Sequence, residues 1–267
     1  MNKLKKRILQ ISLNILKRHI SKFEDIDLYL YNYEKGTISP LLYFSRYLNF
    51  ENSNPTSATN EWRHFEKMLN YENKIVIDVG AAIGATVRLF SKKAKTLYAF
   101  EPQSTNFKHL KTVIKLEKLD NVFPVNSAVS DKVGTTTFYN RESHGIHSLG
   151  MHNKGSVGTR SEVKVTTLDN FCQKNLLSQE IALLKIDVEG FESDVLKGAI
   201  DLLTNKKIKA VIFEYSPKLT TTCGKKENDV FELLTTYGFS IYDALGRRFN
   251  YKTDIKPKLS DFLALLE

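Results

Sequence analysis

Two carboxylates and two glycines in the first half of the chain have the types and spacing that cofactor binding requires. Ile75–Val79 is an apolar run that carries Asp78 near its end and leads into Gly80 and Gly84. A second apolar run ends on Glu101. Glycine lets the backbone approach a ligand, and an acidic residue about 20 positions after such a turn can accept hydrogen bonds from ribose hydroxyls. These residues predict a cradle for a nucleoside-containing cofactor.

The spacing of the glycines separates two classes of cofactor. Dinucleotide sites use Gly-x-Gly-x-x-Gly, which places the pyrophosphate on a helix N-terminus. This chain has Gly80-x-x-x-Gly84 instead. The carboxylate of Asp78 would repel a pyrophosphate, whereas it would attract the ammonium group of a methionine moiety. The turn therefore favours S-adenosylmethionine.

A second group of charged residues, Lys185, Asp187 and Glu189, follows a later apolar run. Leu183–Ile186 is predicted to be a buried strand, and Gly190 begins the turn into a helix. The three charged residues alternate, so they can face the same side of the strand end. In a doubly wound sheet this strand neighbours the first one, and ligands bind where the strand order reverses. We expect Asp187 and Glu189 beside the reacting methyl group; a structural role, such as capping the next helix, is the alternative.

Strands that alternate with helices predict one three-layer α/β domain with a mostly parallel sheet and an antiparallel final pair. The expected strands span residues 75–79, 96–100, 122–125, 183–186, 210–213, 239–242 and 248–251. Helices are expected at 1–23, 41–48, 61–69, 86–94, 104–118, 192–203 and 227–237, with a last helix from about residue 259. Residues 135–139 and 162–166 alternate like two antiparallel strands.

Five segments of the chain carry a resemblance to a known family. They are Asp78-Val79-Gly80-Ala81-Ala82-Ile83-Gly84, Ala99-Phe100-Glu101-Pro102, Asn126-Ser127-Ala128-Val129-Ser130-Asp131, Thr167-Leu168-Asp169 and Lys185-Ile186-Asp187-Val188-Glu189-Gly190. From about Trp62 to Pro217 the chain resembles the FkbM family of S-adenosylmethionine-dependent O-methyltransferases. The resemblance implies a Rossmann-like class I methyltransferase fold, with seven strands of which one is antiparallel. It also implies methyl transfer to a hydroxyl of a sugar, a glycan or a related natural product.

One position departs from the family pattern. The family turn usually reads Gly-Ala-Asn-Ile-Gly, and Ala82 replaces the Asn. The replacement removes a side chain that can hydrogen-bond near the cofactor, and it is one argument for the alternative of a non-catalytic interaction protein on a methyltransferase scaffold. The long segment 140–161 is the other.

The reaction requires a base that takes the hydroxyl proton of the acceptor. The candidates are Asp187, Glu189 and His147, the last within a segment that resembles the Ser-rich stretch of the family. A Mg²⁺ ion held by Asp187 and Glu189 would serve the same purpose by lowering the pKa of the hydroxyl. Spacing does not separate these routes.

The adenine end of the cofactor is assigned to the loop after the third expected strand. Ser127 or Asp131 is expected to hydrogen-bond the exocyclic amine; alternatively, Ser130 and Asp131 only form a turn. The complete set of predicted cofactor-binding residues is Asp78, Gly80, Ala82, Gly84, Thr86, Glu101, Ser127, Asp131 and Lys185.

The net charge of +9 is concentrated at the N-terminus. Residues 1–22 contain seven Lys and Arg and no acidic residue, whereas the remaining chain has 32 basic and 30 acidic residues. A nearly neutral body argues against a nucleic-acid methyltransferase, which is a further alternative, and so does the lack of an Asn/Asp-Pro-Pro-aromatic motif. We expect no nucleic-acid partner.

The N-terminal segment predicts a basic amphipathic helix within an extension over residues 1–60, followed by the methyltransferase domain at 61–267. Such a helix can dock on an anionic membrane surface, or pack on its own domain or a second subunit; the oligomeric state is left open. Cys172 and Cys223 fit reduced thiols, and no segment approaches the ~20 apolar residues of a membrane span. We expect a cytoplasmic protein; contact of residues 1–22 with the inner membrane face is one of the two alternatives for this helix, and packing on the protein itself is the other.

Overall fold

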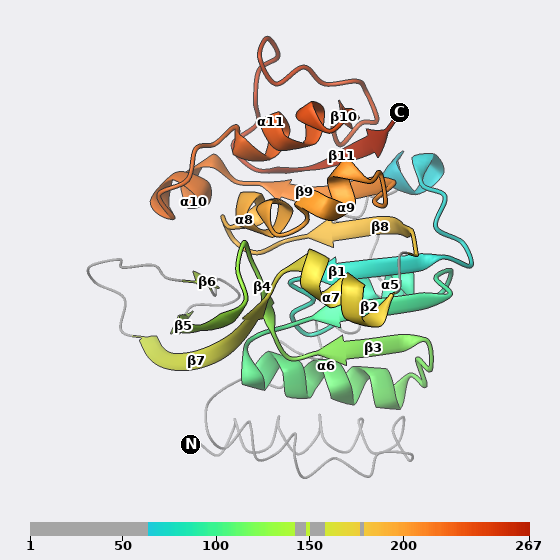
Figure 1. Cartoon of the computed structure of the whole chain (residues 1–267), viewed down its shortest axis with the longest axis vertical. Coiled ribbons are helices and arrows are strands. Elements are labelled where there is room, and N and C mark those ends of the chain that lie inside the picture. The colour runs from blue at the N-terminus through green and yellow to red at the C-terminus, as the bar shows by residue number, and fades with distance from the viewer. Residues whose placement is uncertain (1–63, 142–147, 150–157, 177–178) are drawn as a thin grey trace, which may run out of the picture. The chain divides into compact units, whose positions relative to one another are not determined.

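The computed structural model describes residues 64–141, 148–149, 158–176 and 179–267 (Figure 1). The expected helices at 1–23 and 41–48 and the candidate base His147 lie outside the described residues. The domain boundary after residue 60 and the membrane contact of residues 1–22 therefore stay predictions. None of the helices within the described ranges has the length and apolar content that a membrane span requires.

The larger sheet, as far as the chain is described, has seven strands: β1 (Ile75–Val79), β2 (Thr96–Phe100), β3 (Val122–Val125), β8 (Ile181–Ile186), β9 (Ala210–Tyr215), β10 (Phe239–Tyr242) and β11 (Ser260–Leu266). Their order is β10-β11-β9-β8-β1-β2-β3. All neighbouring strands are parallel except β11, which is antiparallel to both β9 and β10. This topology confirms the predicted mostly parallel sheet, and it places β8 beside β1, where the strand order reverses.

Helices cover both faces of this sheet: α5 (Ala85–Phe90), α6 (Ser104–Leu116), α7 (Leu168–Asn175), α8 (Glu192–Lys197), α9 (Ile200–Thr204), α10 (Pro217–Thr222) and α11 (Asp229–Thr236). Successive residues of a strand point to opposite faces. Val76 accordingly packs with Val87 of α5 and Leu110 of α6, whereas Ile77 belongs to the cluster that contains Val195 of α8. Every residue of β1 and β8 is buried because both faces are covered.

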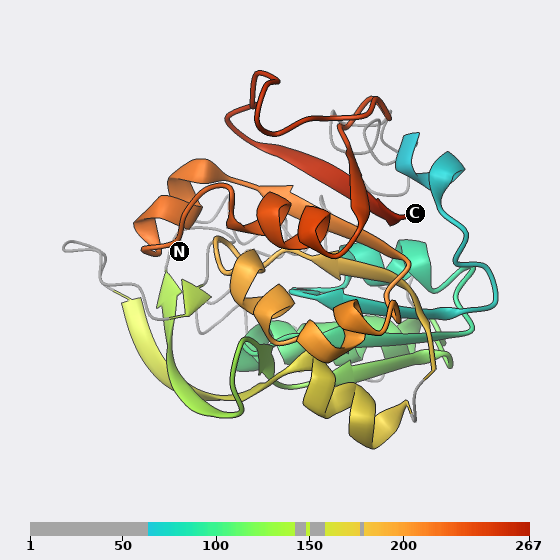
Figure 2. The same cartoon turned by 45° about the horizontal axis from the view of Figure 1, so that its top comes forward.

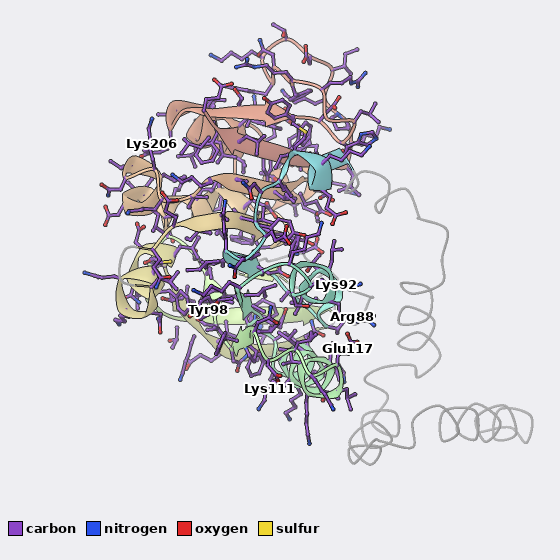
Figure 3. All side chains as sticks on the ribbon, turned by 90° about the vertical axis from the view of Figure 1, so that its right-hand side faces the viewer. Arg88, Lys92, Tyr98, Lys111, Glu117 and Lys206 are labelled. Atoms are coloured by element: carbon purple, nitrogen blue, oxygen red, sulfur yellow. The ribbon has the colours of Figure 1, made fainter. Side chains whose placement is uncertain are left out.

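An ion pair fixes the two helices of one face to each other. Arg88 of α5 contacts Glu117, which follows α6, with 2.6 Å between Nε and Oε1, and both side chains are mostly buried (Figure 3). Lys92 and Lys111 extend from the same side of the molecule. The pair helps to set the orientation of α5, the helix that follows the glycine turn.

A smaller sheet lies beyond the ends of β1 and β2 to which their arrowheads point (Figures 1 and 2). Its strands are β4 (Ala128–Val129), β5 (Gly134–Arg141), β6 (Ser148–Leu149) and β7 (Gly158–Thr166), in the order β4-β7-β5-β6. The antiparallel pairing of β5 with β7 confirms the prediction for residues 135–139 and 162–166. Phe138, Val163, Val165 and Ala128 form a separate small core.

The C-terminus was predicted incorrectly. The expected helix from residue 259 is strand β11, and the expected strand at 248–251 is reduced to an isolated bridge between Tyr242 and Arg248. Phe262, Leu263 and Ala264 are buried in the middle of β11, which inserts between β9 and β10. Helical spacing of the apolar residues is overridden here because the two neighbouring strands supply backbone partners and a core on both faces.

The expected helix at 192–203 is two helices, α8 and α9, which meet at Gly198. A Cβ atom on Gly198 would lie 2.0 Å from the carbonyl oxygen of Ser130. The close approach of that loop interrupts the helix and requires glycine. Helix α10, at Pro217–Thr222, was not predicted.

Candidate active site

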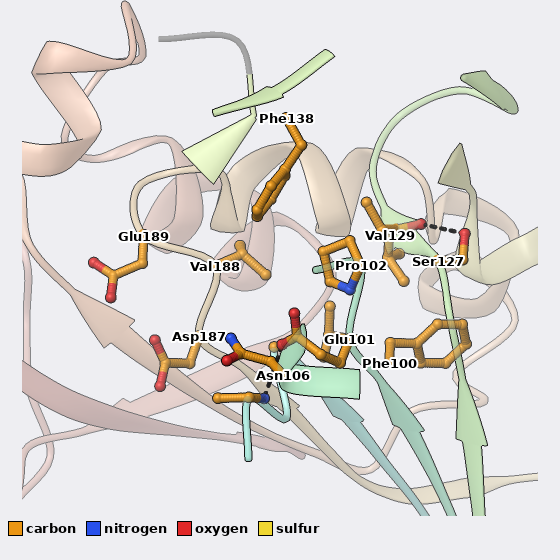
Figure 4. A pocket seen from close by; sticks show the side chains of 14 residues that line it. Phe100, Glu101, Pro102, Asn106, Ser127, Val129, Phe138, Asp187, Val188 and Glu189 are labelled. Atoms are coloured by element: carbon orange, nitrogen blue, oxygen red, sulfur yellow. Dashed lines mark hydrogen bonds between the residues drawn. The ribbon is translucent and has the colours of Figure 1, made fainter. Parts of the chain in front are cut away.

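A pocket opens at the carboxyl ends of β1, β2 and β8, beneath the smaller sheet (Figure 4). Of the predicted site residues, those that line it are Gly80, Ala82, Glu101, Ser127, Asp187 and Glu189. Asp78, Gly84, Thr86, Asp131 and Lys185 do not line it. The predicted residues thus separate into those that can touch a ligand and those that lie outside the pocket lining.

Glu101 has the geometry of a ribose acceptor. The residue is 5% exposed, and each carboxylate oxygen accepts one backbone N–H, from Ala82 (2.9 Å) and from Gln103 (2.7 Å). A carboxylate oxygen has lone pairs for more than one hydrogen bond, so both can still accept from ligand hydroxyls. Burial raises the pKa of Glu101 to about 7, although the two amides act in the opposite direction. The sequence placed this residue correctly because it continues β2, where its N–H bonds to Val125.

The glycine turn after β1 brings the backbone into contact with the loop after β8. Gly80 has φ +85°, and a Cβ there would lie 1.8 Å from the carbonyl oxygen of Asp187, so only glycine lets the turn after β1 touch the loop after β8. The amides of Gly80 and Ala81 bond to the carbonyl of Phe100, and that of Ala82 bonds to Glu101. These amides are therefore not available to a pyrophosphate, which agrees with the choice of S-adenosylmethionine.

Ala82 occupies a left-handed conformation, with φ +48°, and is exposed at the pocket. Asn tolerates this region of backbone space far better than Ala does. An Asn at this position, as the family pattern has it, would therefore relieve backbone strain as well as offer a side-chain hydrogen bond. Ala82 has no polar side chain to offer a ligand, and its backbone N–H already donates to Glu101.

Asp78 and Lys185 form a buried ion pair behind the pocket wall. The Lys185 ammonium lies 3.3 Å from carboxylate oxygens of both Asp78 and Asp187, and it donates to the carbonyl of Gly80 at 3.1 Å. Asp78 is fully buried and also accepts from the hydroxyl of Thr86 at 2.5 Å. Although burial opposes its charge, Asp187 and Asp78 raise the pKa of Lys185 above its ordinary value. We therefore interpret Asp78, Thr86 and Lys185 as positioning groups that fix Gly80 and Asp187.

Asp187 and Glu189 extend from the loop after β8 at one side of the pocket (Figure 4). The Asp187 side chain is 39% exposed, which leaves it accessible while Lys185 holds one of its oxygens. The N–H of Asp187 bonds to Val79 at 3.0 Å, so the loop continues the pairing of β8 with β1. The predicted convergence of Asp187 and Glu189 at this strand end is present in the structure, whereas Lys185 lies behind them.

Two further carboxylates near this loop were not predicted from the sequence. Burial, and then Asp187 and Glu189, raise the pKa of Glu214 in β9 to about 8. Burial and Asp187 raise the pKa of Glu192 to about 7, although backbone amides act in the opposite direction. Glu214 directly follows the expected strand 210–213, and a carboxylate at a strand end is a sequence signal for a site residue. The sequence around Glu192 contains no such signal, because its role depends on tertiary burial.

The opposite side of the pocket is apolar. Phe100 and Val129 lie on the side away from Asp187 and Glu189, and Phe138 of the smaller sheet points into the pocket from above (Figure 4). Ser127 is also part of this wall, but its hydroxyl already donates to the carbonyls of Ala128 and Lys164. Asp131 is exposed, lies outside the lining and accepts from Ser130, as the alternative of a simple turn expects. This wall suits the flat face of an adenine ring.

The described ranges contain no group of three or more His, Cys, Asp and Glu side chains that is arranged to hold a metal ion. The hypothesis of a Mg²⁺ ion at Asp187 and Glu189 thus gains no support from them. His147 cannot be placed relative to the pocket, since it lies outside the described residues.

The reversal of strand order beside β1, the glycine turn and the carboxylate after β2 define a Rossmann-like class I methyltransferase. A comparison with protein families agrees: the profile of the methyltransferase FkbM domain matches residues 78–241, which is more than half of the chain. The chain belongs to the FkbM methyltransferase family. Membership implies S-adenosylmethionine as the methyl donor.

Two curated relatives name more specific activities. The hexuronic acid methyltransferase AglP of Haloferax volcanii is 29% identical over 164 residues, which span 61% of this chain and 62% of that protein. The 2-O-methyltransferase NoeI of Sinorhizobium fredii is 27% identical over 179 residues, or 61% of this chain and 71% of that protein. The chain thus spans less than two thirds of the length of AglP.

A solved structure supports the fold. The methyltransferase FkbM from Methylobacillus flagellatus KT superposes with a TM-score of 0.50 at 14% identity, over 79% of this chain and 48% of that chain. At this level of identity the likeness concerns the fold alone.

Proposed function

We propose that the protein transfers a methyl group from S-adenosylmethionine to a hydroxyl oxygen of a sugar or glycan. The observation that carries the proposal is a pocket with a buried carboxylate, Glu101, in its wall and two further carboxylates, Asp187 and Glu189, at one side. The names of two relatives, a hexuronic acid methyltransferase and a 2-O-methyltransferase, support a sugar as the acceptor.

The residues of the pocket fit the cofactor in two ways. Glu101 keeps free lone pairs for two ribose hydroxyls, and Phe138, Phe100 and Val129 form an apolar slot for the adenine. When bound, S-adenosylmethionine supplies a methyl group on a sulfonium, which is a good leaving group. The main task of the chain is to align the acceptor oxygen with that methyl group.

Proton removal from the acceptor is assigned to the loop after β8. Glu214 retains a proton at neutral pH because its pKa is about 8, so it is a poor base under these conditions. Asp187 is accessible, and Lys185 orients its carboxylate. We therefore place Asp187 first among the bases, with Glu189 as the neighbouring alternative, since a general base must be within hydrogen-bond reach of the hydroxyl.

The test is a transfer assay with S-adenosylmethionine that carries a labelled methyl group. The acceptor panel contains neutral oligosaccharides, hexuronic-acid-containing oligosaccharides and RNA. Methylation of a hydroxyl gives a base-stable ether, whereas methylation of a hexuronic carboxylate gives a base-labile ester. We expect base-stable label in a sugar. Label in RNA alone would favour a nucleic-acid methyltransferase, and cofactor binding without any transfer would favour a non-catalytic protein.

Variants separate chemistry from binding in the same assay. Asp187→Asn is expected to lower kcat about 10²–10⁴-fold, the usual contribution of a general base, while the Kd for the cofactor changes little. Asp120→Asn, at an exposed loop position outside the pocket, is the matched control and keeps full activity. Unchanged turnover in Asp187→Asn would contradict the assignment of the base.

A further inference from the structure

Glu192 is a buried carboxylate to which methyl transfer assigns no chemical step. It lies in the first turn of α8 and is 3% exposed. Its Oε1 atom accepts the backbone N–H of Val188 at 3.2 Å and that of Gly190 at 3.1 Å. Both donors belong to the loop that carries Asp187 and Glu189. The carboxylate is thus bonded to the backbone of the pocket wall, yet it does not line the pocket.

The backbone of that loop is strained where Glu192 binds it. Glu189 has φ +57° and Gly190 has φ +99°. A left-handed conformation costs a non-glycine residue about 1–2 kcal/mol. The N–H groups of Val188 and Gly190, on either side of Glu189, both donate to one carboxylate oxygen of Glu192.

Neighbouring groups leave the loop little room on its other sides. A Cβ on Gly190 would lie 2.9 Å from the carbonyl oxygen of Leu219 and from the sulfur of Cys223. The Cys223 thiol is 3.6 Å from the carbonyl of Glu189, to which it donates. On the pocket side, the backbone of Asp187 touches Gly80. Because Asp187, Val188 and Glu189 all line the pocket, any relaxation of the loop changes the pocket wall.

We propose that Glu192 is a positioning residue: its carboxylate accepts the N–H groups of Val188 and Gly190 and thereby holds Asp187 and Glu189 at the pocket. The consequence for turnover rests on the proposed function, whereas the consequence for the loop does not. Loss of the carboxylate leaves these two N–H groups, that of Gly190 buried and that of Val188 part-buried, without this acceptor, and it removes two hydrogen bonds that hold the loop around the left-handed Glu189.

The experiment compares three variants of the full chain. Glu192→Ala removes the acceptor, and Glu192→Gln keeps an oxygen that can accept both N–H groups. Asp169→Ala is the matched control, because the Asp169 carboxylate likewise accepts two backbone N–H groups, from Asp201 and Leu202, both at 3.0 Å, but does not line the pocket. The readouts are hydrogen exchange of peptides that span 187–192, the Kd for S-adenosylmethionine, and thermal unfolding.

In Glu192→Ala we expect at least tenfold faster exchange in peptides 187–192 and at least a tenfold higher Kd. Glu192→Gln should restore most of both, and Asp169→Ala should lower the melting temperature while the Kd stays unchanged. Wild-type exchange and Kd in Glu192→Ala would overturn the proposal, as would an equal loss of affinity in Asp169→Ala. If Glu192→Ala does not fold, the test rests on Glu192→Gln. This variant should then show an exchange rate in peptides 187–192 and a Kd close to those of the wild-type protein. A folded Glu192→Gln that does not bind the cofactor would refute the proposal. Absence of cofactor binding by the wild-type protein would refute the proposed function, while the exchange data would still decide the role of Glu192.

Discussion

Acidification below pH 7 should weaken binding of S-adenosylmethionine, since it protonates Glu101. Burial raises the pKa of this carboxyl from its ordinary value of 4.5 to about 7. Ribose hydroxyls donate to the ionised form, so the cofactor binds that form more tightly and in turn lowers the pKa of Glu101. The affinity should therefore rise with pH through the range in which Glu101 loses its proton, and become constant above it.

The size of the effect follows from the ionised fraction. With a pKa of about 7, that fraction is about one half at pH 7.0 and roughly 3% at pH 5.5, so the Kd should rise about 15-fold between these values if the ionised form alone binds tightly. The amino group of the cofactor stays protonated over this range, because an α-amino group has a pKa of about 8. It therefore adds no slope of its own.

Calorimetric titrations at pH 5.5, 6.0, 6.5 and 7.0 would measure this profile, with circular dichroism to establish that the protein is folded at each pH. Glu101→Gln replaces charge-assisted hydrogen bonds by neutral ones, so its Kd at pH 7.0 should be about tenfold higher. Its profile should be much flatter, with any remaining slope due to Glu192, whose pKa is also about 7. A wild-type Kd that does not change with pH, or an equal slope in Glu101→Gln, would refute the role of Glu101.

Three further predictions concern the framework of the site. Lys185→Met leaves the fully buried Asp78 without its cation. It should lower the free energy of unfolding, measured by chemical denaturation, by about 3–5 kcal/mol, and adding Asp78→Asn should restore part of this loss. A loss that the second change does not reduce would contradict the pairing. Ala82→Asn should stabilise the protein by about 0.5–1 kcal/mol and raise the melting temperature by about 1–4 °C, because Asn tolerates the left-handed backbone; no gain would argue against strain at this position. The raised pKa values of Glu101 and Glu192 mean that the folded protein binds more protons than the unfolded chain between pH 4.5 and about 7. The free energy of unfolding should therefore fall as pH rises through that window, by roughly 3 kcal/mol for each carboxyl. Denaturation midpoints that rise with pH there would contradict the shifts.

Much of the fold was readable from the sequence because its central strands are apolar runs with polar ends. β1, β2, β3 and β10 begin and end at the predicted residues. Once β2, β1 and β8 are adjacent and parallel, Glu101 and Asp187 must lie at the same edge of the sheet, and that geometry is what the sequence predicted for the site. Local patterns were a strong signal for β1 and β8, because both strands are buried on both faces.

The errors share a physical cause, which is tertiary context. β11 is a strand because β9 and β10 provide partners on both sides, and its own apolar spacing gives no sign of this. Lys185 alternates with Asp187 and Glu189 in the sequence, yet it is buried behind them. Its ammonium lies between the carboxylates of Asp78 and Asp187 and pairs with both. Glu192 gains its role only when the backbone of the preceding loop turns its N–H groups toward it.

A crystal structure of the protein with S-adenosylhomocysteine would test the central claim most directly. The account predicts ribose hydroxyls on the carboxylate of Glu101, the adenine between Phe138 and the wall of Phe100 and Val129, and the thioether sulfur toward Asp187. Ligand density at another place, or none in this pocket at saturating concentration, would contradict it.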